Sequence, residues 1–204
     1  MPAHAAGMVG LVNLIADPEH RTLFDWWLSA RGAREMPSRS DFDPLDHPAL
    51  LPRIFIVAVN PIPPHFRYRL CGTEIDDQQG YQMTGRTFEE LFEGELYCFT
   101  QERFADVAFH RRVSYHSTHF SNDNTAKRSR FTRLLLPLSD DGRRIDTVLG
   151  SRIQVSDFRR NFGQLDDDAG IRRRYEIAVV PAADADRAAV TIVERPGCLG
   201  PIPA

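Results

Sequence analysis

The sequence predicts an α+β domain: a five-stranded antiparallel sheet with short helices on one face and one more helix on the N-terminal side. Two short β-runs, Ile54–Val59 and Phe66–Cys71, are joined by a proline-rich turn and lead directly into short helical segments. After a longer helical segment, three more β-runs follow. The expected order is therefore one helix, two strands, three helices and three strands.

The N-terminal helix is expected to begin at Asp17 and to end before Gly32. The Asp17 carboxylate can accept hydrogen bonds from free backbone amides, and Pro18 is tolerated at the first helical position. Glycine commonly follows a helix end. Residues 34–52 contain four prolines and are expected to wrap the domain as ordered coil. Residues 1–52 thus form an N-terminal helix and wrapping coil.

One side of this helix is strongly apolar, with Leu23, Trp27 and Ala30 on a single stripe and Trp26 beside it. Such a stripe covers either the chain's own sheet or a partner chain, and the pattern leaves both alternatives open. Leu23, Trp26, Trp27 and Ala30 are therefore the residues we expect at the interface of a homodimer or with a signalling protein partner.

Each later element has a local signature. The run Ile54–Val59 is almost entirely apolar, as is typical of a central strand, whereas apolar and polar residues alternate in Phe66–Cys71. Short helices are expected at Thr73–Gln79 and at 87–92, where the sequence Thr-Phe-Glu-Glu resembles a capping box. Residues 95–112 carry an apolar face with helical spacing.

The last three strands are expected at residues 113–120, 131–138 and 146–155, which places the main domain at residues 53–157. Residues 158–204 form a C-terminal extension. Two alternatives stay open for it: a hairpin made from residues 175–180 and 190–193, or partial disorder.

Composition excludes several classes of protein. The chain has 204 residues, 42% of them hydrophobic, which suits one ordinary globular domain. Its net charge of −3 argues against a general nucleic-acid binder. No apolar run is long enough to span a membrane, and the N-terminal stretch lacks the basic region of a secretory signal. Three widely spaced cysteines, Cys71, Cys98 and Cys198, fit free thiols in the cytoplasm.

Five segments together carry a resemblance to a known family: LFDWWLSARG, MPSRSDFDPLDHPALLPRIF, FRYRLCGTEI, MTGRTFEEL and FTRLLLPLSDDG. Over roughly residues 23–155 the chain resembles a bacterial family of small stand-alone PAS-domain proteins. The resemblance implies a PAS-like sheet with helices forming a cleft for a small ligand. It also implies signal transduction through ligand binding, dimerisation and partner contacts rather than turnover.

Metal, haem and flavin are disfavoured as cofactors, and the cofactor is otherwise unknown. His116 and His119 are separated by an odd number along a strand, so they are expected on opposite faces and cannot easily share a metal. His110, at a helix end, is the remaining haem candidate. Cys71 and Cys98 lack the motif of a light-sensing flavin site and are expected to be small buried hydrophobes.

The ligand-binding residues expected in the cleft are Tyr68, Tyr115 and Thr132, from strand alternation, together with Arg69. Arg67 and Arg69 share one face of a strand, which suits either an anion clamp or a solvated edge.

No catalytic motif is present in the sequence, and we do not expect an enzyme. The alternatives are a small α+β enzyme using Glu102 and His119 in the same cleft, or an interaction scaffold without a ligand.

Overall fold

The computed structural model describes residues 9–63, 65–122, 128–156, 171–190 and 193–195. The strands are β1 (Val9–Gly10), β2 (Ile54–Val59), β3 (Phe66–Cys71), β4 (Arg112–Asn122), β5 (Arg128–Leu138), β6 (Thr147–Ser156), β7 (Ile171–Pro181), β8 (Ala189–Val190) and β9 (Val193–Arg195). The α-helices are α1 (Leu11–Leu14), α2 (Pro18–Arg31), α3 (Thr73–Gln79), α4 (Phe88–Leu91) and α5 (Gly94–Ala108). Short 3-10 helices are η1 (Arg39–Asp41), η2 (Pro44–Asp46), η3 (Leu51–Arg53) and η5 (Ala182–Asp184).

The centre of the fold is an antiparallel sheet, as expected. Among the described residues it contains seven strands in the order β3-β2-β6-β5-β4-β7-β9. The first five in this order are the five strands expected from the sequence. The sheet is wider than expected because β7 pairs with β4 along the whole length of that strand and β9 pairs with β7. Strands β1 and β8 form a separate two-stranded sheet.

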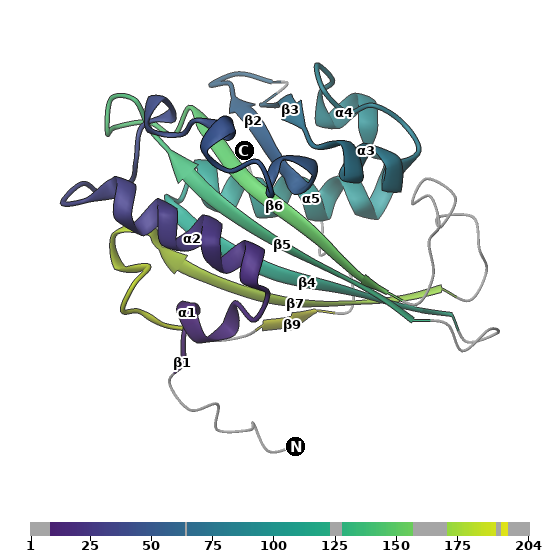
Figure 1. Cartoon of the computed structure of the whole chain (residues 1–204). Helices are drawn as coiled ribbons and strands as arrows, with labels where there is room; N and C mark the ends of the chain where they lie inside the picture. Colours follow the sequence, from purple (N-terminus) through teal and green to yellow (C-terminus); the bar gives the residue numbers. More distant parts are fainter. Residues whose placement is uncertain (1–8, 64, 123–127, 157–170, 191–192, 196–204) are drawn as a thin grey trace.

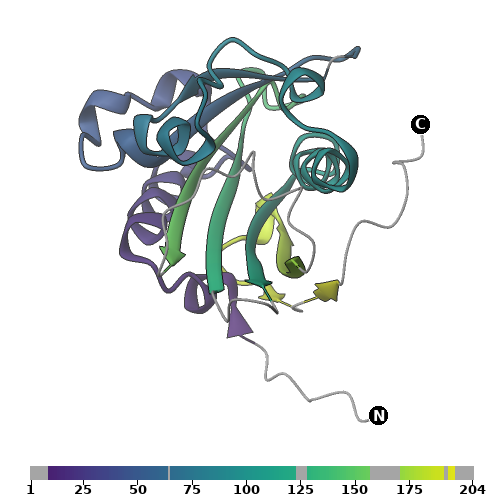
Figure 2. The same ribbon diagram turned by 90° about the vertical axis from the view of Figure 1, so that its right-hand side faces the viewer.

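Helices cover both faces of the large sheet. Figure 1 shows α2 lying across the near face of the central strands, with α5 behind them. The turned view in Figure 2 shows the strands between α2 on one side and α5 on the other. The two faces are called here the α2 face and the α5 face. Consecutive residues of a strand point to opposite faces, so neighbours in sequence contact different helices.

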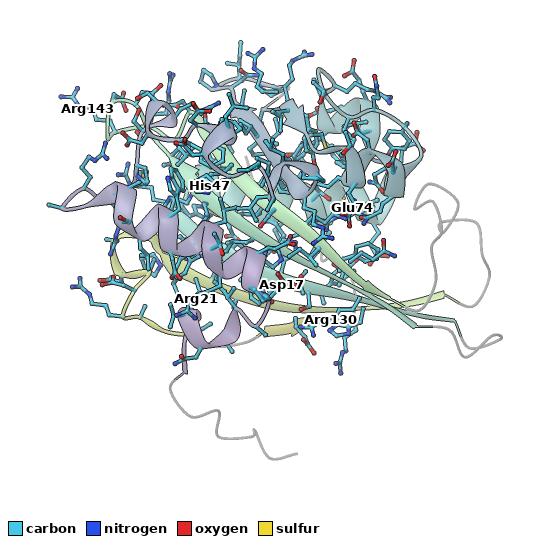
Figure 3. The ribbon with its side chains drawn as sticks, viewed as in Figure 1. Asp17, Arg21, His47, Glu74, Arg130 and Arg143 are labelled. Carbon is cyan, nitrogen blue, oxygen red and sulfur yellow. The ribbon has the colours of Figure 1, made fainter. Side chains whose placement is uncertain are left out.

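The α2 helix begins and ends as expected, and its apolar side lies in the chain's own core. The Asp17 carboxylate accepts a hydrogen bond of 2.9 Å from the backbone amide of Glu19, and Gly32 follows the last helical residue. Figure 3 shows Asp17 at the N-terminal end of the helix. The Trp27 indole nitrogen donates to the carbonyl of Pro137 on β5 at 2.9 Å, which fixes the helix against the sheet.

The α5 helix is shorter than expected: it ends at Ala108, and β4 begins at Arg112. Between them Arg111 has a φ of 54°, a conformation that stops a helix and is rare for arginine. Its guanidinium is paired with Glu35 and donates to the carbonyls of Gly142 and Arg143. These long-range contacts stabilise the turn, and apolar periodicity in the sequence does not report them.

Two glycines allow close packing at the sheet. A Cβ at Gly72 would lie 2.3 Å from the carbonyl oxygen of Pro52, and one at Gly150 would lie 2.3 Å from the Phe55 ring. The missing side chain at Gly150 therefore lets Phe55 cover the centre of β6.

Within the described residues no helix is both long and apolar enough to cross a membrane.

Candidate functional site

A small cavity lies between the α5 face of the sheet and the helices that cover it. Its volume is about 20 Å³, enough for one or two water molecules. The apolar part of its lining is Phe55, Ile75, Met83, Phe92, Phe99 and Phe104. The uncharged polar part is Tyr68, Gln79 and Thr100. Four basic side chains complete the lining, namely Arg103, His116, Arg133 and Arg152.

Three of these basic side chains stand in a row across the central strands. His116 on β4 is the register partner of Arg133 on β5, and Arg133 is the register partner of Arg152 on β6. All three line the same cavity. We call His116, Arg133 and Arg152 the basic row. Like charges directly opposite each other on neighbouring strands are destabilising, so the pairing of two arginines is an unusual feature.

The carboxylates near the row pair with Arg103 and not with Arg133. Arg103 on α5 forms ion pairs with Glu102 and, at 3.1 Å, with Asp106. Arg133 forms no ion pair and no side-chain hydrogen bond with any described residue. The neighbours that favour its charged form are the phenols of Tyr68 and Tyr175, which are neutral at pH 7.

Burial dominates the electrostatics of the row. It lowers the pKa of Arg133, and it lowers that of Arg152 to about 9, with the charge of Arg133 adding to the second effect. Burial and then Arg133 hold the pKa of His116 well below its usual value, so this imidazole is neutral at pH 7. The cationic part of the row is therefore its two arginines.

Aromatic rings pack closely around the row. The Arg152 guanidinium carbon lies 4.6 Å from the centre of the Phe131 ring, a cation–π geometry. The Phe99 ring lies edge-on to His116 at 5.5 Å and stacks on Tyr175 at 3.9 Å between ring centres. Strand β7, which supplies Tyr175, thus supports the helix that closes the cavity.

On the opposite face, a buried histidine links α2 to the same two strands. Nδ1 of His20 lies 2.6 Å from the Ser151 hydroxyl, and Nε2 lies 2.9 Å from the Thr132 hydroxyl. His20 is completely buried, and burial lowers its pKa to about 4. The imidazole is therefore neutral at pH 7 and joins helix α2, strand β5 and strand β6.

The sequence that forms this sheet, its helices and the cavity matches one known family. A family model described as a PAS domain matches residues 15–153, which is more than half of the chain. The chain belongs to the PAS domain family. In two further comparisons, no curated protein and no solved structure matches it.

The PAS domain separates the four ligand-binding residues expected from the sequence. Tyr68 lines the cavity on the α5 face. Tyr115 and Thr132 lie on the α2 face, where Thr132 contacts His20 and Tyr115 lines a separate hollow of about 110 Å³ with Ser117 and Arg130. Arg69 is exposed on β3. Only Tyr68 therefore lies in the cavity between sheet and helices.

The four residues expected at an interface are also separated. Leu23 and Trp27 are completely buried within the PAS domain itself. Trp26 and Ala30 are half-buried, and the Trp26 ring lies 4.8 Å from the Phe42 ring of the wrapping coil. Trp26 and Ala30 are thus the two members that reach the surface of the chain.

The remaining histidines and cysteines do not gather at one place. His116 and His119 point to opposite faces as expected, because His116 contacts Phe99 whereas His119 lies 3.1 Å from Glu176 on the α2 face. Glu102 belongs to α5, on the other side of the sheet from His119. Described residues contain no group of three or more side chains arranged to hold a metal ion.

The other two candidate residues each have a local partner. His110 is exposed and lies 3.3 Å from Asp106. The Cys71 thiol lies 3.8 Å from the Met83 sulfur, and burial raises its pKa, so it is protonated at pH 7.

Sequence reasoning missed the basic row. Arg133 and Arg152 stand inside two largely apolar β-runs, Phe-Thr-Arg-Leu-Leu-Leu and Val-Leu-Gly-Ser-Arg-Ile. An arginine within a strand whose neighbours are all core residues is rarely buried without a reason. That signal was available, whereas the opposition of the two arginines required the register.

Proposed function

We propose that this PAS domain is a bacterial, cytoplasmic sensory module that binds a small ligand in the cavity on the α5 face and transmits binding to α2. The observation that carries the proposal is the direct connection between cavity and helix. Arg133 lines the cavity and its neighbour Thr132 contacts His20; Arg152 lines the cavity and its neighbour Ser151 contacts the same imidazole.

A shift of either arginine toward a ligand would move the adjacent hydroxyl on the other face. His20 bridges both hydroxyls within short hydrogen-bond distance. A movement of β5 relative to β6 therefore changes the position of α2 on the sheet. Densely packed interiors transmit such strain rather than absorb it.

A second connection runs around the edge of the sheet. The Arg53 guanidinium is paired with Glu19 on α2 and donates to Glu74 on α3 at 2.7 Å; Figure 3 labels Glu74. Helix α3 supplies Ile75 and Gln79 to the cavity lining. Displacement of α3 by a ligand would therefore also act on the N-terminal turn of α2.

The output that we propose is a contact made by the outer side of α2 and the adjoining coil, either in a homodimer or with a signalling protein partner. Trp26 and Ala30 reach the surface there, and Leu45 of η2 is 77% exposed. These three side chains supply the apolar part of the proposed contact, since contiguous exposed apolar patches mark interaction surfaces.

Native mass spectrometry of the freshly purified protein tests the ligand and the oligomer together. We expect a dimer mass, and a mass excess that disappears when the protein is denatured. A homogeneous monomer without added mass would contradict both parts of the proposal.

The small volume of the cavity favours a second candidate function, an interaction scaffold that needs no ligand. Two measurements distinguish the scaffold from the sensor. A scaffold would dimerise or bind its partner without a bound small molecule. In addition, no added compound would change the hydrogen exchange of α2.

A further inference from the structure

Two arginines on neighbouring strands line the cavity, and one of them, Arg133, has no carboxylate partner among the described residues. Arg133 and Arg152 face the same space from directly opposed positions on β5 and β6. Arg152 is only 2% exposed, whereas Arg133 is half-buried. Placing a buried cation beside another normally costs several kcal/mol unless an anion accompanies it.

The carboxylates on the helix side are already engaged by another residue. Glu102 and Asp106 both pair with Arg103, which leaves that arginine balanced within α5. For Arg133, the described residues offer two neutral phenols and no carboxylate within ion-pair distance. Arg133 therefore has no negatively charged partner among the described residues.

The shape and lining of the cavity define the kind of anion. A guanidinium fork matches the two oxygens of a carboxylate, and charge-assisted hydrogen bonds of this type are the strong ones. The rest of the lining is rich in phenylalanine, including Phe55, Phe99 and Phe104, which suits an apolar remainder next to the carboxylate.

We propose that the basic row is the recognition site for the carboxylate of a small organic acid, with Arg133 as the principal anchor. This inference rests on the proposed function, because it names the ligand class of the same cavity. The cavity of about 20 Å³ admits little more than the carboxylate itself. An acid with a larger apolar remainder would therefore have to displace α3 or α5, which is the movement that a sensor needs.

Binding of matched acids and amides tests the proposal. Propionate and benzoate are compared with propionamide and benzamide, which have nearly the same shape and no charge, by calorimetry and thermal unfolding. At least one acid is expected to bind, and to bind at least ~10-fold more tightly than its amide, since only the acid makes charge-assisted hydrogen bonds to the guanidinium. Chloride and inorganic phosphate serve as further probes and are expected to bind more weakly than the acids.

Arg133→Met is the decisive variant and Arg69→Met, at an exposed position of the same sheet, is its control. We expect Arg133→Met to weaken binding of the acid by at least ~10-fold and to raise the melting temperature of the ligand-free protein, because the opposed charge is removed. Arg69→Met should leave both unchanged. Arg133→Lys keeps the charge without the fork and should fall between wild type and Arg133→Met.

Three outcomes overturn the carboxylate proposal in different ways. Equal binding of acid and amide that survives Arg133→Met would show a ligand cavity, and so uphold the sensory function, but not an anion site. Phosphate or chloride binding as tightly as the acids would make it a general anion site. Binding of none of the probes, with no molecule retained in native mass spectrometry, would remove the ligand function as well.

Discussion

His20 is a single side chain on which α2, β5 and β6 all depend, and its protonation should control stability in acid. Its pKa is about 4 in the folded protein against about 6.5 in the unfolded chain. Between these values the unfolded state binds a proton that the folded state does not, so the free energy of unfolding falls as the pH falls.

From pH 7 to pH 5 this histidine alone is expected to lower the free energy of unfolding by about 2 kcal/mol. Urea unfolding at the two pH values measures the loss. His20→Gln should reduce the difference between them, while His116, whose pKa is also lowered, continues to contribute in both proteins. An unchanged pH dependence in His20→Gln would contradict this account of His20.

Gly72 provides a second prediction at the scale of one residue. Its absent Cβ would lie 2.3 Å from the carbonyl oxygen of Pro52, a backbone atom that cannot rotate away. Gly72→Ala should therefore lower the free energy of unfolding by roughly 1–3 kcal/mol, as overpacking does. Gly10→Ala is the matched control because nothing lies within 4 Å of that position. Equal effects of the two substitutions would disprove the close approach.

At the scale of one element, α2 depends on the cap at its first turn. Asp17→Ala removes the acceptor for the Glu19 amide and should lower the free energy of unfolding by about 1 kcal/mol, measured by urea titration at pH 7. Asp25→Ala on the same helix removes an exposed ion pair with Arg21 and should have a smaller effect, since such pairs contribute little.

Most elements could be predicted from the sequence because their signals are local. The cap at Asp17, the proline-rich turn after Val59 and the alternation in β3 each depend on a few neighbouring residues. The end of α5 could not, because it depends on Arg111 contacting Glu35, a residue far away in the chain. The hairpin alternative for residues 175–180 and 190–193 anticipates the antiparallel pairing of β7 with β9. The pairing of β7 with β4 could not be predicted, since it is a long-range contact.

For the whole molecule, the central expectation is energetic coupling through the sheet. Arg133→Met and His20→Gln act on opposite faces yet share β5, so their effects on the free energy of unfolding should depart from additivity by more than about 0.5 kcal/mol. A cycle that pairs His20→Gln with Arg69→Met should be additive. Additivity in both cycles would argue against transmission through β5 and β6.

The candidate site was predictable only in part. Strand alternation identified Tyr68 as a cavity residue. Tyr115 and Thr132 point to the α2 face instead, because the register with neighbouring strands, rather than the strand's own sequence, decides which of its residues face which side of the sheet. The basic row needed both the register of β4, β5 and β6 and the position of α5 above them. Neither the register nor the position of α5 can be derived from a single amino-acid sequence without the fold.

The packing of α2 against strands that come much later in the sequence also has a consequence during synthesis of the chain. His20 is 131 residues away from Ser151, and Trp27 is 110 residues away from Pro137. At about 5–20 residues per second, the ribosome takes roughly 7–26 s to complete the strands that cover this helix. During that interval the apolar stripe of α2 is exposed to the cell, which makes the nascent chain a natural client for chaperones that hold apolar segments.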